Sequence, residues 1–145
     1  MTAARLVIDT NVVVSGLITA DPRAATAQVL DGMLAARFPY LVSAELLAEY
    51  RRVLLRPRIR RLHGLDETAV DALLTQLALN AAVREPPPFL GHVPDAGDRH
   101  LWALVASDRA AVLVTGDGAL RRGSPEPERV LSPRQALSLL SGHSA

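Results

Sequence analysis

Cysteine and lysine are both missing from this chain of 145 residues, and aromatic residues make up only 3% of it. The lack of cysteine excludes disulfide bonds and thiolate-ligated metals, and it fits a reducing cytoplasm. No stretch reaches the roughly 18–20 uncharged apolar residues that a membrane-spanning helix requires. The first residues, MTAARLVID, contain a single arginine before an aspartate, which is unlike a secretory signal. These absences favour a cytoplasmic protein with no membrane span.

A large excess of charge of either sign is also missing. The formal net charge is +1, so a nucleic-acid partner would have to be recognised by a local cluster of basic residues. Hydrophobic residues make up 49% of the chain, and its length suffices for one core. No repeat or linker divides the sequence. We therefore expect residues 1–145 to form a single domain.

Short apolar runs alternate with amphipathic segments along the chain. The runs predict five strands, at residues 5–9, 40–42, 82–84, 111–115 and 130–131. Helix start signals predict five helices, at residues 21–37, 44–55, 66–81, 98–106 and from 132 onwards. Strands that alternate with helices indicate a parallel sheet covered by helices on both faces. The predicted fold class is therefore an α/β sandwich.

Carboxylates follow two of these strands. Asp9 comes at the end of the first strand, and Asp117 lies just beyond the fourth. Ligands of open parallel sheets bind outside the carboxyl ends of the strands, so both acids are expected at one edge. An unpaired carboxylate in an apolar environment is costly, which makes Asp9 hard to explain as an ordinary strand residue.

Further acids are candidates for the same edge. Glu49 lies near the margin of the apolar face of the helix at 44–55, and Asp95 and Asp98 precede the helix that leads into the fourth strand. Each acid has an ordinary alternative: Asp98 as a helix N-cap, Asp117 as a turn residue before glycine, and Glu49 as a solvated helix charge. Together they are a stronger signal, because like charges gather where a cation holds them.

The acids belong to three segments: VIDTNVVVSGL (7–17), SAELLAEYRRVLLRP (43–57) and PDAGDRHLWALVASDRAAVLVTGD (94–117). These segments resemble the PIN-domain family of metal-dependent ribonucleases, in particular the VapC-like toxins of type II toxin–antitoxin systems. The Asp-Thr-Asn after the first strand and the Thr-Gly-Asp after the fourth are the most specific parts of the resemblance.

The resemblance implies a three-layer α/β/α sandwich whose central parallel sheet has strand order 3-2-1-4-5. It also implies an acidic pocket that binds Mg²⁺ or Mn²⁺. The acids that it assigns to catalysis and metal binding are Asp9, Glu49, Asp98 and Asp117. Asn11 and Thr115 match the polar positions that support the pocket. Four acids suit these oxygen-preferring metals better than zinc.

The third acid lies where the sequence departs from the family pattern. The family often has Asp-Pro-Asp-Asp-Asn, whereas this chain has Asp95-Ala96-Gly97-Asp98-Arg99. We assign Asp98 rather than Asp95, because apolar Leu101 and Trp102 follow it at the helical spacing of the motif. Arg99 replaces the usual asparagine.

Histidines and arginines complete the list of candidates. The histidines show no metal-ligand spacing and are predicted to be structural or on the surface: His63, His92, His100 and His143. Six arginines lie within eleven residues: Arg51, Arg52, Arg56, Arg58, Arg60 and Arg61. They either end a helix favourably for its dipole or contact RNA phosphates, and Arg56, Arg58 and Arg60 are the candidate RNA contacts.

The predicted activity is metal-dependent hydrolysis of RNA phosphodiester bonds by the toxin of a toxin–antitoxin pair. The partners implied by the resemblance are an RNA substrate, a small antitoxin protein and a second copy of the chain in a homodimer. Two alternatives stay open: a PIN nuclease with a housekeeping role in RNA processing, and a PIN domain that binds RNA or protein without cleaving it. The complete set of acids argues against the second alternative.

Overall fold

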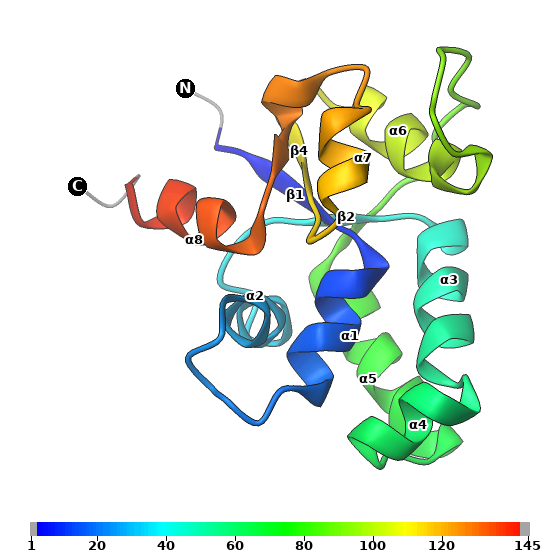
Figure 1. Ribbon diagram of the computed structural model, residues 1–145, viewed down its shortest axis with the longest axis vertical. Helices are drawn as coiled ribbons and strands as arrows, with labels where there is room; N and C mark the ends of the chain where they lie inside the picture. Colours follow the sequence, from blue (N-terminus) through cyan, green and yellow to red (C-terminus); the bar gives the residue numbers. More distant parts are fainter. Residues whose placement is uncertain (1–2, 143–145) are drawn as a thin grey trace.

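The computed structural model describes residues 3–142 (Figure 1). Its strands, all paired in parallel, are β1 (Arg5–Ile8), β2 (Leu41–Val42), β3 (Ala82–Val83), β4 (Ala111–Val114) and β5 (Val130–Leu131). β4 pairs with β1 on one side and β5 on the other, while β2 pairs with β3. A single parallel bridge between Leu6 and Tyr40 joins the two groups of strands. The strands therefore follow the predicted order 3-2-1-4-5, and the fold is a three-layer α/β/α sandwich.

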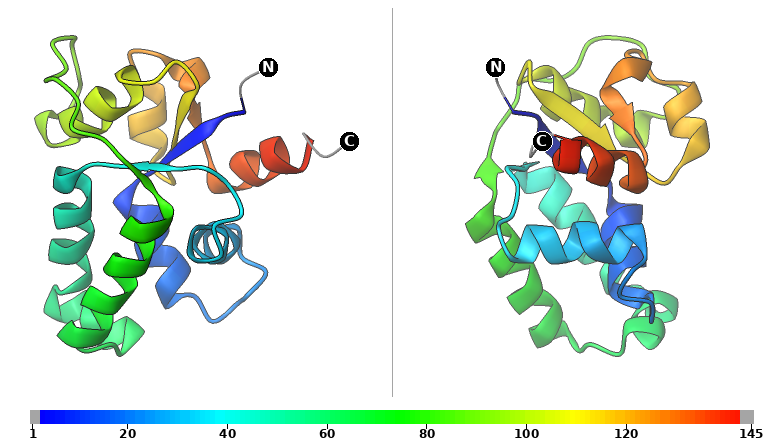
Figure 2. Two further views of the ribbon diagram at one scale, coloured as in Figure 1. Left: turned by 180° about the vertical axis from the view of Figure 1, so that it is seen from behind. Right: turned by 90° about the vertical axis from the view of Figure 1, so that its left-hand side faces the viewer.

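Helices make up most of the remaining structure. They are α1 (Thr10–Ile18), α2 (Ala25–Leu34), α3 (Ala44–Leu54), α4 (Pro57–His63), α5 (Glu67–Asn80), α6 (Arg99–Ala106), α7 (Gly118–Arg122) and α8 (Pro133–Gly142), with 3₁₀ turns η1 (Ala96–Asp98) and η2 (Pro127–Arg129). α6 packs on β1 and β4, whereas α1 packs against α2 and α3. α3 and α5 run side by side in both Figure 1 and Figure 2. Within residues 3–142, no helix is long and apolar enough to cross a membrane.

Side-chain caps fix several of the predicted helix starts. The hydroxyl of Ser43 accepts a hydrogen bond from the amide of Leu46 at the start of α3, 3.1 Å away. At α8, Ser132 and Gln135 form a reciprocal capping box: each side chain accepts from the other's backbone amide, at 3.1 and 2.9 Å. Each of these bonds satisfies an amide that has no partner inside the helix.

Two predicted boundaries were wrong. The first strand ends at Ile8 rather than at residue 9, and the unpredicted α1 follows directly (Figure 1). The helix predicted at 21–37 is shorter, because Asp21 accepts from the amide of Arg23 in a turn and α2 spans only Ala25–Leu34. The helix predicted at 44–55 is α3 and ends at Leu54, and Pro57 then begins the unpredicted α4, where its missing amide proton costs nothing.

The core lies between the sheet and the helices on both of its faces. The apolar face of α2 contributes Val29, Leu30 and Met33, whose side chains are almost fully buried. This face packs against the chain's own core and is not left open for another protein. Four large apolar side chains remain exposed among the described residues: Leu62, Leu79, Val83 and Leu90.

Candidate active site

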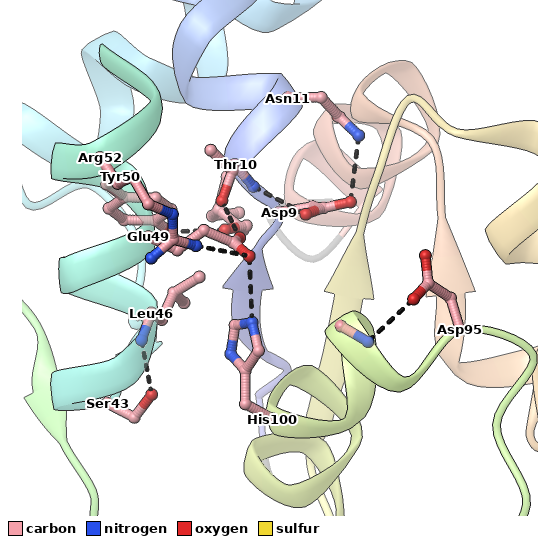
Figure 3. A network of polar contacts seen from close by, with 12 residues as sticks. Asp9, Thr10, Asn11, Ser43, Leu46, Glu49, Tyr50, Arg52, Asp95 and His100 are labelled. Atoms are coloured by element: carbon pink, nitrogen blue, oxygen red, sulfur yellow. Dashed lines mark hydrogen bonds and ion pairs between the residues drawn. The ribbon is translucent and has the colours of Figure 1, made fainter. Parts of the chain in front are cut away.

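Asp9 lies where β1 ends and α1 begins, and it is the N-cap residue of α1. Its Oδ1 accepts a hydrogen bond from the amide of Thr10 at 2.8 Å, and its Oδ2 accepts from Asn11 at 3.0 Å (Figure 3). The residue is only 7% exposed. Burial raises the pKa of Asp9, whereas the hydrogen bonds from Thr115 and Thr10 lower it. The buried carboxylate is therefore held in place from several directions.

Thr115 follows β4 and connects the two strand ends. Its hydroxyl donates to Oδ2 of Asp9 at 2.8 Å and accepts from the amide of Asp117 at 3.0 Å. Asn11 reaches across as well, because its side-chain oxygen accepts from the amide of Gly116 at 3.0 Å. Asn11 and Thr115 thus each bind the carboxylate of Asp9 and a backbone amide of the segment after β4.

Glu49 approaches the same edge from α3. One carboxylate oxygen accepts from the hydroxyl of Thr10, and the other lies 3.3 Å from Nε2 of His100 and 3.8 Å from Arg52 (Figure 3). The hydrogen bond from His100 lowers the pKa of Glu49 and outweighs burial, which acts in the opposite direction. The next residue along the helix, Tyr50, donates its hydroxyl proton to the carbonyl of Ile8. This bond ties α3 to the end of β1.

Asp98 is the last residue of η1, at the start of α6, and its side chain makes no helix-capping hydrogen bond. Its pKa is raised to about 6. Burial is the largest cause, and the next is charge repulsion from four neighbouring acids: Asp9, Asp95, Glu49 and Asp117. Asp98 occupies the N-cap position of α6, but its side chain lacks the hydrogen bonds that the helix-cap alternative requires.

Asp95 and Asp117 both use their carboxylates in local turns. Asp95 accepts from the amide of Gly97 at 2.8 Å and lies apart from Glu49 and Asp9 in Figure 3. Asp117 is the N-cap of α7, and its Oδ1 accepts from the amides of Ala119 and Leu120 at 2.9 and 3.3 Å. The turn role anticipated for Asp117 is thus present, and its second carboxylate oxygen is still available to a ligand.

The donor set suits a hard divalent cation. The converging groups are carboxylates, which Mg²⁺ and Mn²⁺ prefer, and their mutual repulsion would be relieved by positive charge. Within residues 3–142, no group of three or more acidic or histidine side chains forms a ready-made metal cage. A site without such a cage is compatible with Mg²⁺, because this ion usually keeps several waters and binds only one or two carboxylates together with substrate phosphates.

His100 and Thr10 are contacts that the sequence interpretation missed. Both hold Glu49, and the side chain of His100 is only 8% exposed. Thr10 belongs to the Asp-Thr-Asn segment that the sequence analysis singled out, so its place in the site could have been predicted. The position of His100 two residues after Asp98 was visible too, but its contact with Glu49 depends on how α6 packs against α3.

The arginine cluster divides into two parts. Arg51 forms ion pairs with Asp71 at 2.8 Å and Glu67 at 2.5 Å, so it serves the contact between α3 and α5. Arg56, Arg58 and Arg60 are exposed, at or next to α4. Figure 1 shows α4 at the end of α3 that points away from the sheet.

Comparison with known protein families identifies a PIN domain. Residues 5–119 match the sequence profile of the PIN domain, which includes the strand ends and helices that carry all four acids. No curated protein matches the chain closely enough to count as a relative. PIN domains are generally metal-dependent nucleases, in agreement with an acidic site of this composition. Because the match covers well over half of its length, the chain belongs to the PIN-domain family.

Proposed function

We propose that this PIN domain is a ribonuclease that depends on Mg²⁺ or Mn²⁺. The observation that carries the proposal is the hydrogen-bond network at the strand ends, in which Thr115 links Asp9 to Asp117 and Thr10 links Asp9 to Glu49. A binding module has no need for acids that repel one another at one sheet edge. RNA is proposed as the substrate from the resemblance to the VapC-like ribonucleases.

The chain's own residues hold the acids in fixed positions. Thr115 and Asn11 orient Asp9, while Thr10 and His100 orient Glu49. When bound, a divalent cation supplies positive charge to the phosphate and activates water for hydrolysis. Asp98 and the free oxygen of Asp117 would complete its protein ligands. Holding the carboxylates before substrate arrives reduces the reorganisation that the reaction requires.

The test is Mn²⁺-dependent cleavage of single-stranded RNA by the wild-type chain and two matched variants. Asp98→Asn should lose cleavage, because it removes one of the converging charges while keeping the side-chain shape. Asp95→Asn is the control: its carboxylate caps Gly97 in an exposed turn, so substantial cleavage should remain. Full activity of Asp98→Asn, or no cleavage by the wild-type chain with any divalent metal, would contradict the proposal.

We further propose that the nuclease is the toxin of a type II toxin–antitoxin pair, present as a cytoplasmic homodimer that a small antitoxin inhibits. Exposed Leu62 and Leu79, on α4 and α5, are available for such contacts. Expression of the chain alone should slow bacterial growth, and co-expression of a neighbouring small gene should relieve the effect. Soluble expression without any growth effect would instead favour a housekeeping role in RNA processing.

A further inference from the structure

A pocket lies beside the acids, between the start of α3, the segment that follows β3, and α6. Its volume is about 330 Å³, near the lower end of the roughly 300–1,000 Å³ found for ligand sites. The lining residues that matter here are Ser43, Glu45, Glu85, Phe89, Arg99 and His100. None of the roles described above requires this pocket.

His100 lines the pocket and contacts Glu49, and one of its ring nitrogens is unused. Nε2 of His100 is hydrogen-bonded to Glu49, but its Nδ1 is buried and has no hydrogen-bond partner among residues 3–142. Figure 3 shows this second ring nitrogen on the side that faces α3, where Ser43 lies. A buried polar atom without a partner costs free energy, so one in a pocket wall indicates a place for a ligand.

The outer wall of the pocket is fixed by Arg99. Its guanidinium donates to the carbonyls of Phe89 and Gly91, at 2.8 and 2.9 Å. The phenyl ring of Phe89 lies against Gly91 so closely that a Cβ atom at residue 91 would fall 2.6 Å from it. The arginine that replaces the family's usual asparagine therefore holds this segment and its aromatic ring beside α6.

The side chains that line the pocket favour a nucleobase with two adjacent hydrogen-bond donors. The carboxylates of Glu45 and Glu85 can only accept hydrogen bonds when ionised, and the ring of Phe89 offers an apolar surface. Guanine presents two neighbouring N–H groups on its Watson–Crick edge, which a carboxylate can accept together. Uracil presents one N–H between two carbonyl oxygens, which the carboxylates would repel. Unpaired RNA bases are commonly recognised by such edge contacts next to aromatic side chains.

We propose that this pocket binds an unpaired guanine of the RNA, with Glu45 or Glu85 accepting from its Watson–Crick edge and His100 Nδ1 contacting the same base. The inference rests on the proposed ribonuclease function, for which it supplies a base preference. Because His100 also holds Glu49, the bound guanine would lie next to the cleaved phosphodiester.

Binding of the nucleosides themselves tests the pocket without any cleavage. Guanosine should shift the NMR signals of the His100 ring, assigned with a His100→Gln variant, whereas uridine should not. The double variant Glu45→Gln/Glu85→Gln should bind guanosine at least tenfold more weakly. Glu128→Gln, at an exposed glutamate in η2, is the control and should bind like the wild type. Equal shifts with guanosine and uridine, unchanged binding by the double variant, or a response only to an arginine-rich peptide would overturn the proposal.

Cleavage of a random RNA pool separates this proposal from the nuclease assignment. Cut sites enriched in guanine next to the cleaved bond, with the enrichment lost in the double variant, support both. Cleavage without any base preference would overturn the guanine pocket and leave the nuclease assignment in place. Guanosine binding by a chain that cleaves no RNA would overturn the nuclease assignment and leave the pocket as a guanine site.

Discussion

The hydroxyl of Thr115 lies 2.8 Å from Oδ2 of Asp9, so a hydrogen bond joins two residues that are 106 positions apart. The same hydroxyl accepts from Asn11 at 3.3 Å and from the amide of Asp117 at 3.0 Å. Thr115 is completely buried, and water cannot replace it. One side chain thereby connects the acid after β1 with the acid after β4.

Thr115→Val should destabilise the protein and Thr115→Ser should not. Valine keeps the shape but leaves the buried carboxylate of Asp9 short of a donor, which costs about 1–3 kcal/mol. Serine keeps the hydroxyl. Urea unfolding at pH 7 measures both changes. Equal free energies of unfolding for the two variants would show that the hydroxyl contributes nothing to stability.

Mg²⁺ or Mn²⁺ should raise the melting temperature of the wild-type chain by several degrees. A ligand that binds only the folded state at about 100 times its dissociation constant stabilises it by about 2.7 kcal/mol. Burial and repulsion from neighbouring acids disfavour the charged form of Asp98, and a cation would relieve the repulsion. The increase should be much smaller for Asp98→Asn and retained for Asp95→Asn. Thermal unfolding with added metal or with chelator measures it, and an identical increase in both variants would place the metal elsewhere.

The ion pair between Arg5 and Asp108 should make stability depend on pH in the acid range. Nε of Arg5 lies 2.6 Å from Oδ2 of Asp108, and the hydrogen bond from Arg5 lowers the pKa of this aspartate. An unfolded aspartate has a pKa of about 3.9. Above that pH the unfolded aspartate is charged too, and the pair stabilises the fold fully. As the pH falls through the lower pKa of the folded state, this stabilisation is lost.

Arg5→Met tests this dependence. At pH 7 the variant should unfold at lower urea concentration than the wild type. The difference should shrink as the pH falls below about 4, because the unfolded chain then takes up a proton on Asp108 that the folded wild type still resists. A difference that stays constant from pH 7 to pH 3 would mean that Arg5 stabilises the fold by packing rather than through its charge.

Neutralising the exposed arginines at α4 should weaken RNA binding. The variant replaces Arg56, Arg58 and Arg60 by glutamine. If each contacts one phosphate, the slope of log affinity against log salt should fall in magnitude by about 2. The measurement is binding of single-stranded RNA over a salt series in chelator, where metal-dependent cleavage does not occur.

A second triple variant, which loses the same number of positive charges, serves as the control for that experiment. Arg23, Arg109 and Arg134 are exposed in other parts of the fold, and their replacement removes the same three charges. Its salt slope should stay near that of the wild type. Equal effects of the two triple variants would show that only the total charge matters and would remove the α4 arginines from the RNA path.

Gly16 should not tolerate a side chain. A Cβ atom there would lie 2.5 Å from the carbonyl oxygen of Thr26 and 3.0 Å from Cβ of Leu30, so alanine would push α1 away from α2. Overpacking of this kind costs about 1–3 kcal/mol. Gly142→Ala is the control, because nothing lies within 4 Å of its added Cβ. Urea unfolding compares them, and a Gly16→Ala variant as stable as the wild type would contradict the close packing of the helices.

Much of the fold was predictable because strands and helices alternate with clear start signals. Helix α1 was not, because Val12, Val13 and Val14 are β-branched and do not favour a helix by themselves. The helix forms because Asp9 caps its first turn and because the buried valines pack inside the core. Both causes depend on tertiary structure, which outweighs local propensity here.

Within the candidate site, the positions of the strand-end acids follow from topology, whereas the contacts of their neighbours do not. Parallel pairing of β1 with β4 places the residues after both strands at one edge, so the meeting of Asp9 and Asp117 follows from topology. The contact between His100 and Glu49 has no such origin. It arises where α6 packs against α3, and no spacing along the chain encodes the distance between two helices.

The pairing of β1 with β4 also determines when the site can form during synthesis. Residue 5 pairs with residue 111, and the last hydrogen bond to Asp9 comes from Thr115. A ribosome that has made only the first hundred residues has produced Asp9, Glu49 and Asp98 but not the strand and hydroxyl that hold them together. Contacts between such distant residues form slowly, because a long loop must close first. The nascent chain therefore stays without a complete acidic site until residue 117 has emerged.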